Sequence, residues 1–410
     1  MRSLPHQARP IQLQGWLVVA LVATSATQLR ISGLPVGPGE IGLVAWMAVA
    51  SAATLLAWGM AWRLPLGFWP VAAFWIAILP LVWLGFLRAS AAGLNEESGA
   101  DRDMLAILFV AVFAVVLSAH LSTAAAARTL LRGYSIAAAV TLLALLVVAI
   151  PLRRIGPFEL WYEIVRFVGL ATNPNQLALF VAPIPFLVAQ ALADDRSLSG
   201  FRCFLVAGAA FVVGIATTSD ALLAAWVACV GAMATWWWVR SLNMAHRSPW
   251  KLLFLLVVLP ALAAGFLFAV GPSVYEVLER KLVSLIDFGS QASVRLTLWS
   301  HGVDALAQSP LFGWGPGAHS GMAGPFGAME SHNTYVDWAT ISGLFGVAAL
   351  VALLVNVLWR CVNANKPYLA LAVTSLASFA AFHYVLRQPV FWFVLVSILA
   401  WSREDSTCAA

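Results

Sequence analysis

The chain has 410 residues, of which 62% are hydrophobic and only 10% carry a charge. An ordinary soluble protein is about 25% charged, so this chain has too little polar surface to cover a water-soluble particle of its size. The net charge of +5 comes from basic residues that stand singly or in pairs between apolar runs, which argues against a nucleic-acid partner. The composition excludes a soluble multidomain protein and indicates an integral membrane protein.

Twelve apolar stretches are predicted to cross a membrane as helices, since a span needs about 20 mostly apolar residues. The first stretch follows Arg2 and Arg9 but lacks the small-residue cleavage site of a signal peptide, so we expect it to remain as a helix. The predicted spans are 15–32, 40–62, 66–87, 104–124, 133–152, 174–193, 202–217, 220–239, 252–270, 336–358, 368–386 and 389–402.

An even number of spans puts both termini on the same side of the membrane. Placing them in the cytoplasm puts more than half of the 23 Lys and Arg residues on that side, in the direction that the enrichment of basic residues in cytoplasmic loops requires. The short loop with Arg128 and Arg132 supports this orientation best. We therefore predict an all-α membrane protein with cytoplasmic N and C termini.

One connection, residues 271–335, is much longer than the others, and loops of such length are usually functional. Its first part, 274–285, has the apolar spacing of an amphipathic helix that lies on the membrane surface. A second helix is expected over 292–308, followed by a tight Gly- and Pro-rich turn over 310–317. The chain thus divides into three parts. Residues 1–270 hold nine spans, residues 271–335 form a large outer loop, and residues 336–410 hold three spans and a tail.

Two shorter outer loops also carry polar residues. The loop 153–173 runs into the sequence Asn-Pro-Asn at 173–175, where an Asn cap followed by Pro predicts the start of the sixth span. The loop 88–103 contains Asp101 and Asp103, a pair of carboxylates that could hold a divalent ion. Because further glutamates stand in the same loop, we expect a solvated acidic patch instead.

His332 precedes the tenth span and is a candidate general base, because the unperturbed pKa of histidine, about 6.5, lies near the working pH. Its setting at the membrane surface also allows a simpler role. In that alternative, His332 and Asn333 only cap the helix and anchor it at the level of the lipid headgroups.

Arg166 and Arg295 lie in different outer loops and could converge above the bundle. Two guanidinium groups suit a phosphate or diphosphate, since they are always charged and bind oxygen pairs in a bidentate manner. The alternative for each arginine is a side chain that reaches to the membrane surface and pairs with Glu163 or a headgroup.

Gly313, Gly315 and Gly317 could let the backbone approach an anion, or could simply form a turn between two loop helices. His301 and His319 stand in the same loop as His332, but their spacing is not that of a metal site. We expect no metal and no other cofactor. Scattered ionisable residues such as Asp220 do not form the pattern of a proton relay.

Three motifs together resemble the bacterial O-antigen ligase family and its superfamily. His332-Asn333 followed by nine residues, Gly343 and Gly346 matches the pattern H-N-x9-G-x-x-G. The sequence Ser-Val-Arg-Leu-Thr-Leu-Trp at 293–299, with Pro-Leu-Phe-Gly-Trp-Gly-Pro-Gly at 310–317, is similar to the arginine helix and glycine turn of this superfamily. Arg166 through Gly169 to Asn175 resembles its other outer signature.

The resemblance implies a GT-C-like membrane glycosyltransferase of the bacterial inner membrane that acts at the periplasmic face. Its donor is a glycan on undecaprenyl diphosphate, its partners include membrane lipid but no nucleic acid, and its mechanism is metal-independent and inverting. His332 is then the general base, Arg166 and Arg295 bind the diphosphate, and the supporting residues are Asn333, Gly315, Gly317 and Asn175.

Within this superfamily the histidine pattern favours a ligase that transfers O-antigen polysaccharide to lipid A-core. The first alternative is a polymerase of O-antigen or exopolysaccharide, which shares the donor and uses a glycan as acceptor. A transporter or flippase is a further alternative, but it predicts polar residues along a path at the membrane midplane. One departure is Ser219-Asp220, where many members have Ser-Arg.

Overall fold

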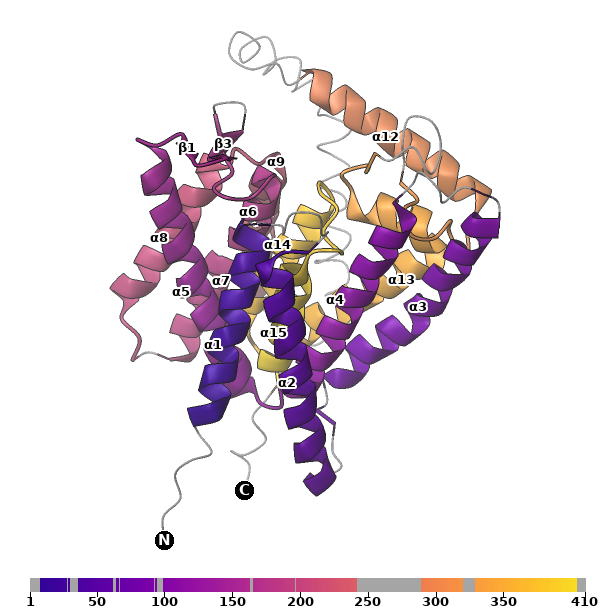
Figure 1. Cartoon of the computed structure of the whole chain (residues 1–410). Coiled ribbons are helices and arrows are strands. Elements are labelled where there is room, and N and C mark those ends of the chain that lie inside the picture. The colour runs from indigo at the N-terminus through magenta and orange to yellow at the C-terminus, as the bar shows by residue number, and fades with distance from the viewer. Residues whose placement is uncertain are drawn as a thin grey trace.

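The computed structural model describes residues 8–27, 29, 36–61, 64–65, 67–91, 93, 99–162, 165–195, 197–241, 289–319 and 329–403. These residues form a bundle of helices with two short β-hairpins (Figure 1). The helices before the long loop are α1 (Ala8–Val22), η1 (Ala23–Thr27), α2 (Pro38–Ala61), α3 (Phe68–Ala91), α4 (Ala100–His120), α5 (Ala124–Ala149), α6 (Pro174–Val181), α7 (Ile184–Asp194), α8 (Gly200–Ala216) and α9 (Asp220–Ser241). The later helices are α12 (Gly289–Gln308), α13 (Thr334–Asn363), α14 (Pro367–Ala380) and α15 (Pro389–Trp401).

Seven helical stretches in the described part of the chain are long and apolar enough to cross a membrane. They include α2, α3, α4, α5, α9 and α13, and the seventh combines α6 and α7. Four apolar stretches are shorter, and they are α8, α14, α15 and the stretch Leu13–Thr27, which covers the later part of α1 together with η1. Each of these lies at a predicted span, while the predicted span 252–270 lies outside the described residues. A helical multi-pass membrane protein is therefore supported, and the count of twelve spans stays a prediction.

The loop before α6 folds into two antiparallel hairpins, which the sequence did not predict. Strand β1 (Arg154–Ile155) pairs with β2 (Phe158–Glu159), and β3 (Trp161–Tyr162) pairs with β4 (Arg166–Phe167). Strands of two residues are too short to show an alternation of apolar and polar side chains. The second hairpin fixes the position of Arg166, which stands opposite Tyr162.

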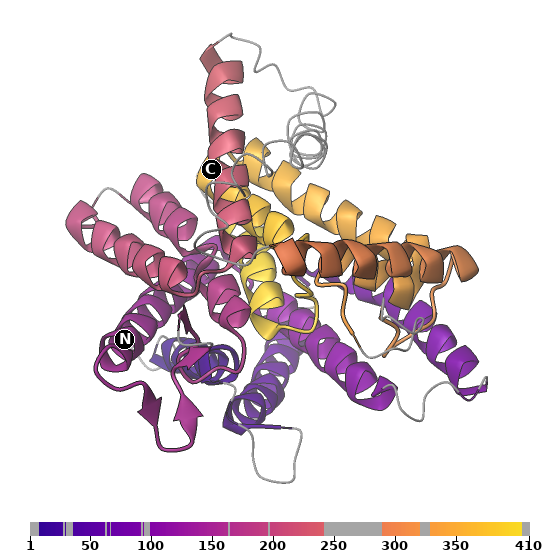
Figure 2. The same cartoon turned by 90° about the horizontal axis from the view of Figure 1, so that it is seen from above.

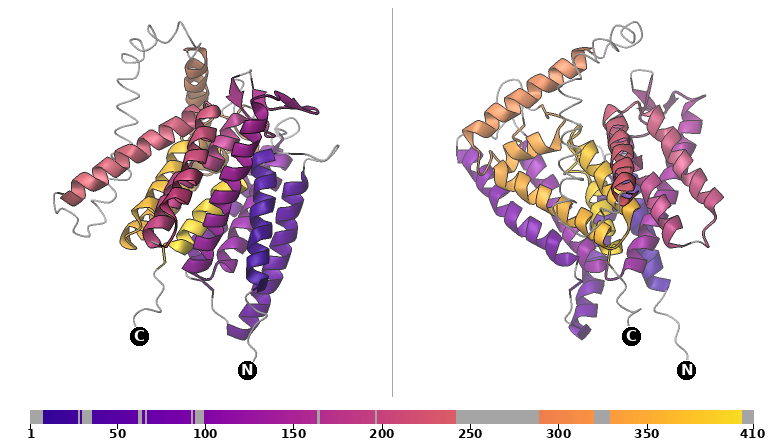
Figure 3. Two further views of the ribbon diagram at one scale, coloured as in Figure 1. Left: turned by 90° about the vertical axis from the view of Figure 1, so that its left-hand side faces the viewer. Right: turned by 180° about the vertical axis from the view of Figure 1, so that it is seen from behind.

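The two ends of the bundle differ in structure. The hairpins and α12 lie at one end, while α1 begins and α15 ends at the other (Figures 1 and 3). Seen from above, α12 crosses over α13 instead of running along it (Figure 2), and the two helices are in contact. This arrangement agrees with a single outer face on which the hairpins, α12 and the start of α13 lie together.

The opposite end carries a cluster of charges around Asp194. Its carboxylate accepts hydrogen bonds from Gln190 and from the indole of Trp401, and lies 3.9 Å from Lys366 Nζ and 4.0 Å from Arg128 Nε. These basic residues are among those predicted to face the cytoplasm. Charges assigned to one side of the membrane by sequence therefore meet at one end of the bundle.

Helix α15 forms the centre of the bundle. All of its residues, Pro389 to Trp401, are buried, and it packs against α4 and α5. A helix that is apolar all round is found in a protein core or in a membrane, and here the protein itself buries it. Its Trp392 ring lies 4.7 Å from that of Trp75 on α3, centroid to centroid. Helix α15 is thus part of the buried core of the bundle.

The predicted turn at 310–317 docks into a break in α13. Gly343 has a φ of 68° and a ψ of −171°, which interrupts the helix and takes nearby backbone groups out of the helical hydrogen-bond ladder. The turn supplies the missing partners. Trp314 N–H donates to Thr340 O at 2.7 Å, Gly315 N–H donates to Ile341 O at 2.9 Å, and Pro310 O accepts from Leu344 N–H at 2.8 Å.

The glycines of this junction allow a close approach of backbones. Gly315 has a φ of 89°, and a Cβ atom there would overlap the backbone of Gly85 and Phe86 on α3. Gly317 has a φ of 79° and faces the backbone of Ala100 at the start of α4. The turn therefore joins α3, α4 and α13. The N–H of Gly315 already donates to the carbonyl of Ile341. This agrees with the alternative in which the glycines form a turn between helices.

We predict that Gly315→Ala destabilises the protein. A side chain at this positive φ costs about 1–3 kcal/mol, and the overlap with α3 adds a cost of similar size. Gly133→Ala is the matched control, because this glycine lies within α5 and its Cβ would meet nothing within 4 Å. Thermal unfolding in detergent should show a lower midpoint for Gly315→Ala and an equal or higher midpoint for Gly133→Ala. Equal midpoints for Gly315→Ala and wild type would contradict the close packing of Gly315 against α3.

Candidate functional site

Helix α12 brings Arg295 to the start of α13. The helix predicted over 292–308 is confirmed, with bounds Gly289–Gln308. Trp299 lies one turn after Arg295, and its indole N–H donates to the carbonyl of Ser331 at 3.0 Å. Because residues four apart lie on the same helix face, Arg295 is directed toward the segment that contains His332.

A network of hydrogen bonds fixes the first turn of α13. Asn333 is the N-cap residue, and its side-chain oxygen accepts from the backbone N–H groups of Tyr335 and Val336. Ser331 N–H donates to Asp337 Oδ1 at 2.9 Å, and Thr334 Oγ1 donates to the carbonyl of His383 at 2.6 Å. Asn333 thus has the capping role that the sequence allowed for it, while His332 lies just before the cap.

His332 is held with a φ of 56°, a conformation that costs a residue with a side chain about 1–2 kcal/mol. Its half-buried ring lies parallel to the ring of His383, with a centroid distance of 6.1 Å. Burial lowers the pKa of His332, and the positive charge of Arg295 lowers it further, while Asp337 acts in the opposite direction. The imidazole is therefore neutral at pH 7 and able to accept a proton.

Arg166 is held by the turn between α8 and α9. Its Nε donates to the carbonyl of Thr217 at 3.3 Å, and its Nη2 donates to Asn175 Oδ1 at 3.4 Å. The same Asn175 oxygen accepts from Ser219 Oγ at 2.7 Å. The predicted cap at Asn173 is confirmed, since its side chain accepts from the N–H of Asn175 and orients the first turn of α6. Asn175 therefore links Arg166 to the turn.

Arg295 reaches the same turn from the other side. Its Nη2 lies 4.0 Å from the carboxylate of Asp220, the first residue of α9. Both guanidinium groups therefore contact residues 217–220, although the arginines are far apart in the sequence. The alternative partner of Arg166, Glu163, lies outside the described residues. Asp220, which departs from the Ser-Arg pattern, is the acidic neighbour of Arg295.

The prediction of a solvated acidic patch at 101–103 is wrong for Asp103. Asp101 is exposed, but Asp103 is only 2% exposed. Its carboxylate accepts a hydrogen bond from Arg387 and lies 3.0 Å from His319 Nε2. The loop ends before Asp103, because α4 begins at Ala100. Asp103 is therefore part of the helix and lies on its buried face.

Sequence reasoning missed Asp337 and Arg387. Asp337 is fully buried within the first turn of α13, and an ionisable residue inside a predicted span is itself a signal of function. Arg387 is a single basic residue between the last two apolar helices. Its partners Asp103 and Glu330 are 284 and 57 residues away in the chain, so no local pattern reveals them.

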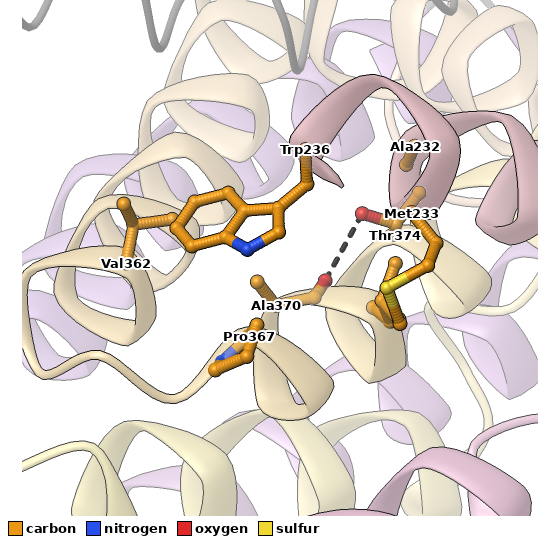
Figure 4. A pocket seen from close by; sticks show the side chains of 8 residues that line it. Ala232, Met233, Trp236, Val362, Pro367, Ala370 and Thr374 are labelled. Atoms are coloured by element: carbon orange, nitrogen blue, oxygen red, sulfur yellow. Dashed lines mark hydrogen bonds between the residues drawn. The ribbon is translucent and has the colours of Figure 1, made fainter. Parts of the chain in front are cut away.

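Among the described residues, no three His, Cys, Asp or Glu side chains gather as metal ligands. An apolar pocket lies elsewhere, between α9, α14 and the end of α13 (Figure 4). It is lined by residues such as Met233, Trp236 and Thr374, and the Thr374 hydroxyl donates to the carbonyl of Ala370 in its own helix. Met233 is thirteen residues along α9 from Asp220, about 20 Å at the rise of a helix. The pocket is therefore separate from the arginines.

Residues 204–351 match the family model described as O-antigen ligase. This region is thus similar to that family, and the match covers less than half of the chain. The matched region contains Arg295, His332 and Asn333, whereas Arg166 and Asn175 precede it. The resemblance to this superfamily is thus confirmed, and it supports a glycan-handling function of the ligase or polymerase type and, more generally, a glycosyltransferase-like enzyme. No curated protein sequence matches the chain.

We predict that the pKa of His332 lies below the value of about 6.5 for a free imidazole and rises in Arg295→Gln. The substitution removes a positive charge that disfavours the imidazolium. NMR titration of histidine-labelled protein in nanodiscs measures this, with His332→Ala to assign the signal. Arg154→Gln, which removes an exposed arginine paired with Glu159, should leave the pKa unchanged. An equal pKa in Arg295→Gln and wild type would show that the two side chains are not coupled.

Proposed function

We propose that the protein is an O-antigen ligase. It transfers polysaccharide from undecaprenyl diphosphate to lipid A-core at the periplasmic face of the bacterial inner membrane. The observation that carries this proposal is the arrangement of a neutral histidine and two arginines, of which Arg295 and His332 lie in the region similar to this family and Arg166 precedes it. The charge of Arg295 lies close enough to His332 to lower its pKa, and Arg166 and Arg295 both contact the turn 217–220.

The donor fits the location of the arginines. A polyprenyl diphosphate keeps its tail in the hydrocarbon and its phosphates at the level of the headgroups. Arg166 and Arg295 lie at the outer end of the helices, next to the first residues of α6 and α9. Guanidinium groups there can bind diphosphate oxygens through charge-assisted hydrogen bonds.

The proposed step is a single displacement. The acceptor hydroxyl oxygen attacks the anomeric carbon of the donor glycan, and its proton passes to the neutral imidazole of His332. A new glycosidic C–O bond forms as the bond between the anomeric carbon and the diphosphate breaks. The electron pair leaves with undecaprenyl diphosphate, where Arg166 and Arg295 stabilise the developing charge. One displacement from the opposite face inverts the anomeric configuration.

Supporting residues orient these groups. Asn333 caps α13 directly after His332, and Asn175 holds Arg166 against the turn. Gly315 and Gly317 let the turn 310–317 pack against α3 and α4, which fixes α12 relative to α13. The roles proposed for these residues are thus structural support of the base and of the diphosphate site.

We predict that His332→Ala lowers kcat by about 10²- to 10⁴-fold, because it removes the proton acceptor, and leaves donor binding intact. The assay uses purified protein in liposomes with lipid-linked glycan and lipid A-core. His120→Gln, at the opposite end of α4, is the control and should transfer normally. Full transfer by His332→Ala would disprove the general-base role. Extension of a second lipid-linked glycan in place of lipid A-core would identify a polymerase.

A separate prediction concerns donor affinity. Arg166→Ala and Arg295→Ala should each weaken binding of undecaprenyl diphosphate by about 10- to 100-fold, the effect of losing a hydrogen bond between charged groups. Asp220→Asn should strengthen binding a few-fold, because it removes a negative charge beside Arg295. Arg154→Ala is the control for a general loss of positive charge. Unchanged affinity in both arginine variants would contradict a diphosphate site here.

A further inference from the structure

A ring of charged side chains lies behind the segment that bears His332. His319 Nε2 lies 3.0 Å from Asp103 Oδ2, and His319 Nδ1 lies 3.7 Å from Asp337 Oδ1. Arg387 Nη1 donates to Asp103 Oδ1 at 2.5 Å, and Arg387 Nη2 donates to Glu330. Ser331 N–H closes the ring by donating to Asp337.

The ring joins parts of the chain that are distant in sequence. Asp103 belongs to α4, His319 follows the glycine turn, Asp337 belongs to α13, and Arg387 precedes α15. Asp103, His319 and Asp337 are each at most 5% exposed. Carboxylates buried to this degree are stable only when cations and hydrogen-bond donors compensate their charge.

The charges of the ring favour an imidazolium at His319. With a neutral imidazole, the cations beside Asp103 would be Arg387 and the exposed Arg102, and Asp337 would be left with the N–H of Ser331 as its donor. Burial by itself lowers the pKa of His319, but the contacts with Asp103 and Asp337 outweigh it and hold the pKa above its ordinary value. The charged or titratable groups that face this imidazole or its partners are Asp103, Asp337, Glu330, Arg387, Tyr384, Arg102 and His332.

Both attachments of the ring to the outer segment fall directly before His332. Arg387 binds the side chain of Glu330, and Asp337 binds the N–H of Ser331. His332 itself has a positive φ, and such a conformation persists only where the surroundings determine it strongly. The ring restrains the backbone before His332 through Glu330 and the N–H of Ser331. Trp299 of α12 restrains it by donating to the carbonyl of Ser331.

We propose that His319, as an imidazolium between Asp103 and Asp337, is a positioning residue for His332. It holds α4 and α13 together. By compensating part of the charge of Asp337, it also limits how strongly Asp337 raises the pKa of His332. This inference rests on the proposed transferase function only for its effect on the rate. Its effect on the titration of His332 holds whatever reaction the protein catalyses.

The test is His319→Gln in the full-length protein. A neutral amide removes the cation beside Asp337, and Asp337 raises the pKa of His332, so NMR titration should show a higher His332 pKa than in wild type. Glycan transfer should lose about 10- to 100-fold in kcat, as expected for a misplaced catalytic group. The donor KM should change less than about twofold, because the arginines are intact.

Asp103→Asn is the second variant, and Asp101→Asn is its control, since Asp101 is exposed in the same turn of α4. If His319 acts through Asp103, Asp103→Asn lowers kcat without changing the donor KM. The double variant His319→Gln/Asp103→Asn should then have a kcat no lower than that of the more impaired single variant. Asp101→Asn should behave as wild type.

The outcomes separate this proposal from the proposed function. A folded His319→Gln with wild-type kcat and an unchanged His332 pKa overturns the positioning role. If His319→Gln does not fold, Asp103→Asn with wild-type kcat overturns it. If the wild-type protein transfers no glycan, the proposed function fails, and the His332 pKa in His319→Gln and Asp101→Asn still decides whether the ring controls His332.

Discussion

The hydrogen bond from Ser331 N–H to the buried carboxylate of Asp337 is the interaction on which the outer site depends. It folds the chain back onto the first turn of α13, so that His332 takes a positive φ directly before the Asn333 cap. A buried carboxylate can hold such a corner because an N–H donor and a cation compensate its charge. The same carboxylate faces His319, which connects the corner to α4 and to Arg387.

A second constraint is the junction between the glycine turn and the break in α13. The turn completes the backbone hydrogen bonds that the break at Gly343 removes from the helix. Two motifs that look independent in the sequence, the glycine turn and the Gly343 position after His332-Asn333, are thus the two sides of one contact. Since α12 leads directly into this turn, the contact also sets where Arg295 lies relative to His332.

Much of this arrangement could be predicted from the sequence because it is local. Apolar runs and their breaks predicted the helices, and the Asn-Pro pair at 173–174 predicted the start of α6. Spacing within 20 or so residues carries this information. That Arg166 and Arg295 could converge was suggested by their charge and not by local spacing, and neither their shared turn nor the position of Asp220 beside Arg295 was predicted.

The remaining features depend on contacts between distant segments. Asp103 looked solvated because its sequence neighbours are polar, yet its partners His319 and Arg387 are 216 and 284 residues away. The β-hairpins have strands of only two residues, which leave no periodic signal. Local spacing also could not distinguish between an anion-binding role and a packing role for Gly315, since the decisive neighbour is the backbone of α3.

The pH dependence of kcat/KM for glycan transfer tests the central claim most directly, because it reports the ionisation of the free enzyme's base. With His332 as the base, the rate should fall in one acidic limb. Its apparent pKa should lie below about 6.5, equal the His332 pKa measured by NMR, and move upward in His319→Gln. An acidic limb whose apparent pKa differs from the His332 pKa measured by NMR, or one that stays fixed when the His332 pKa moves, would contradict this assignment.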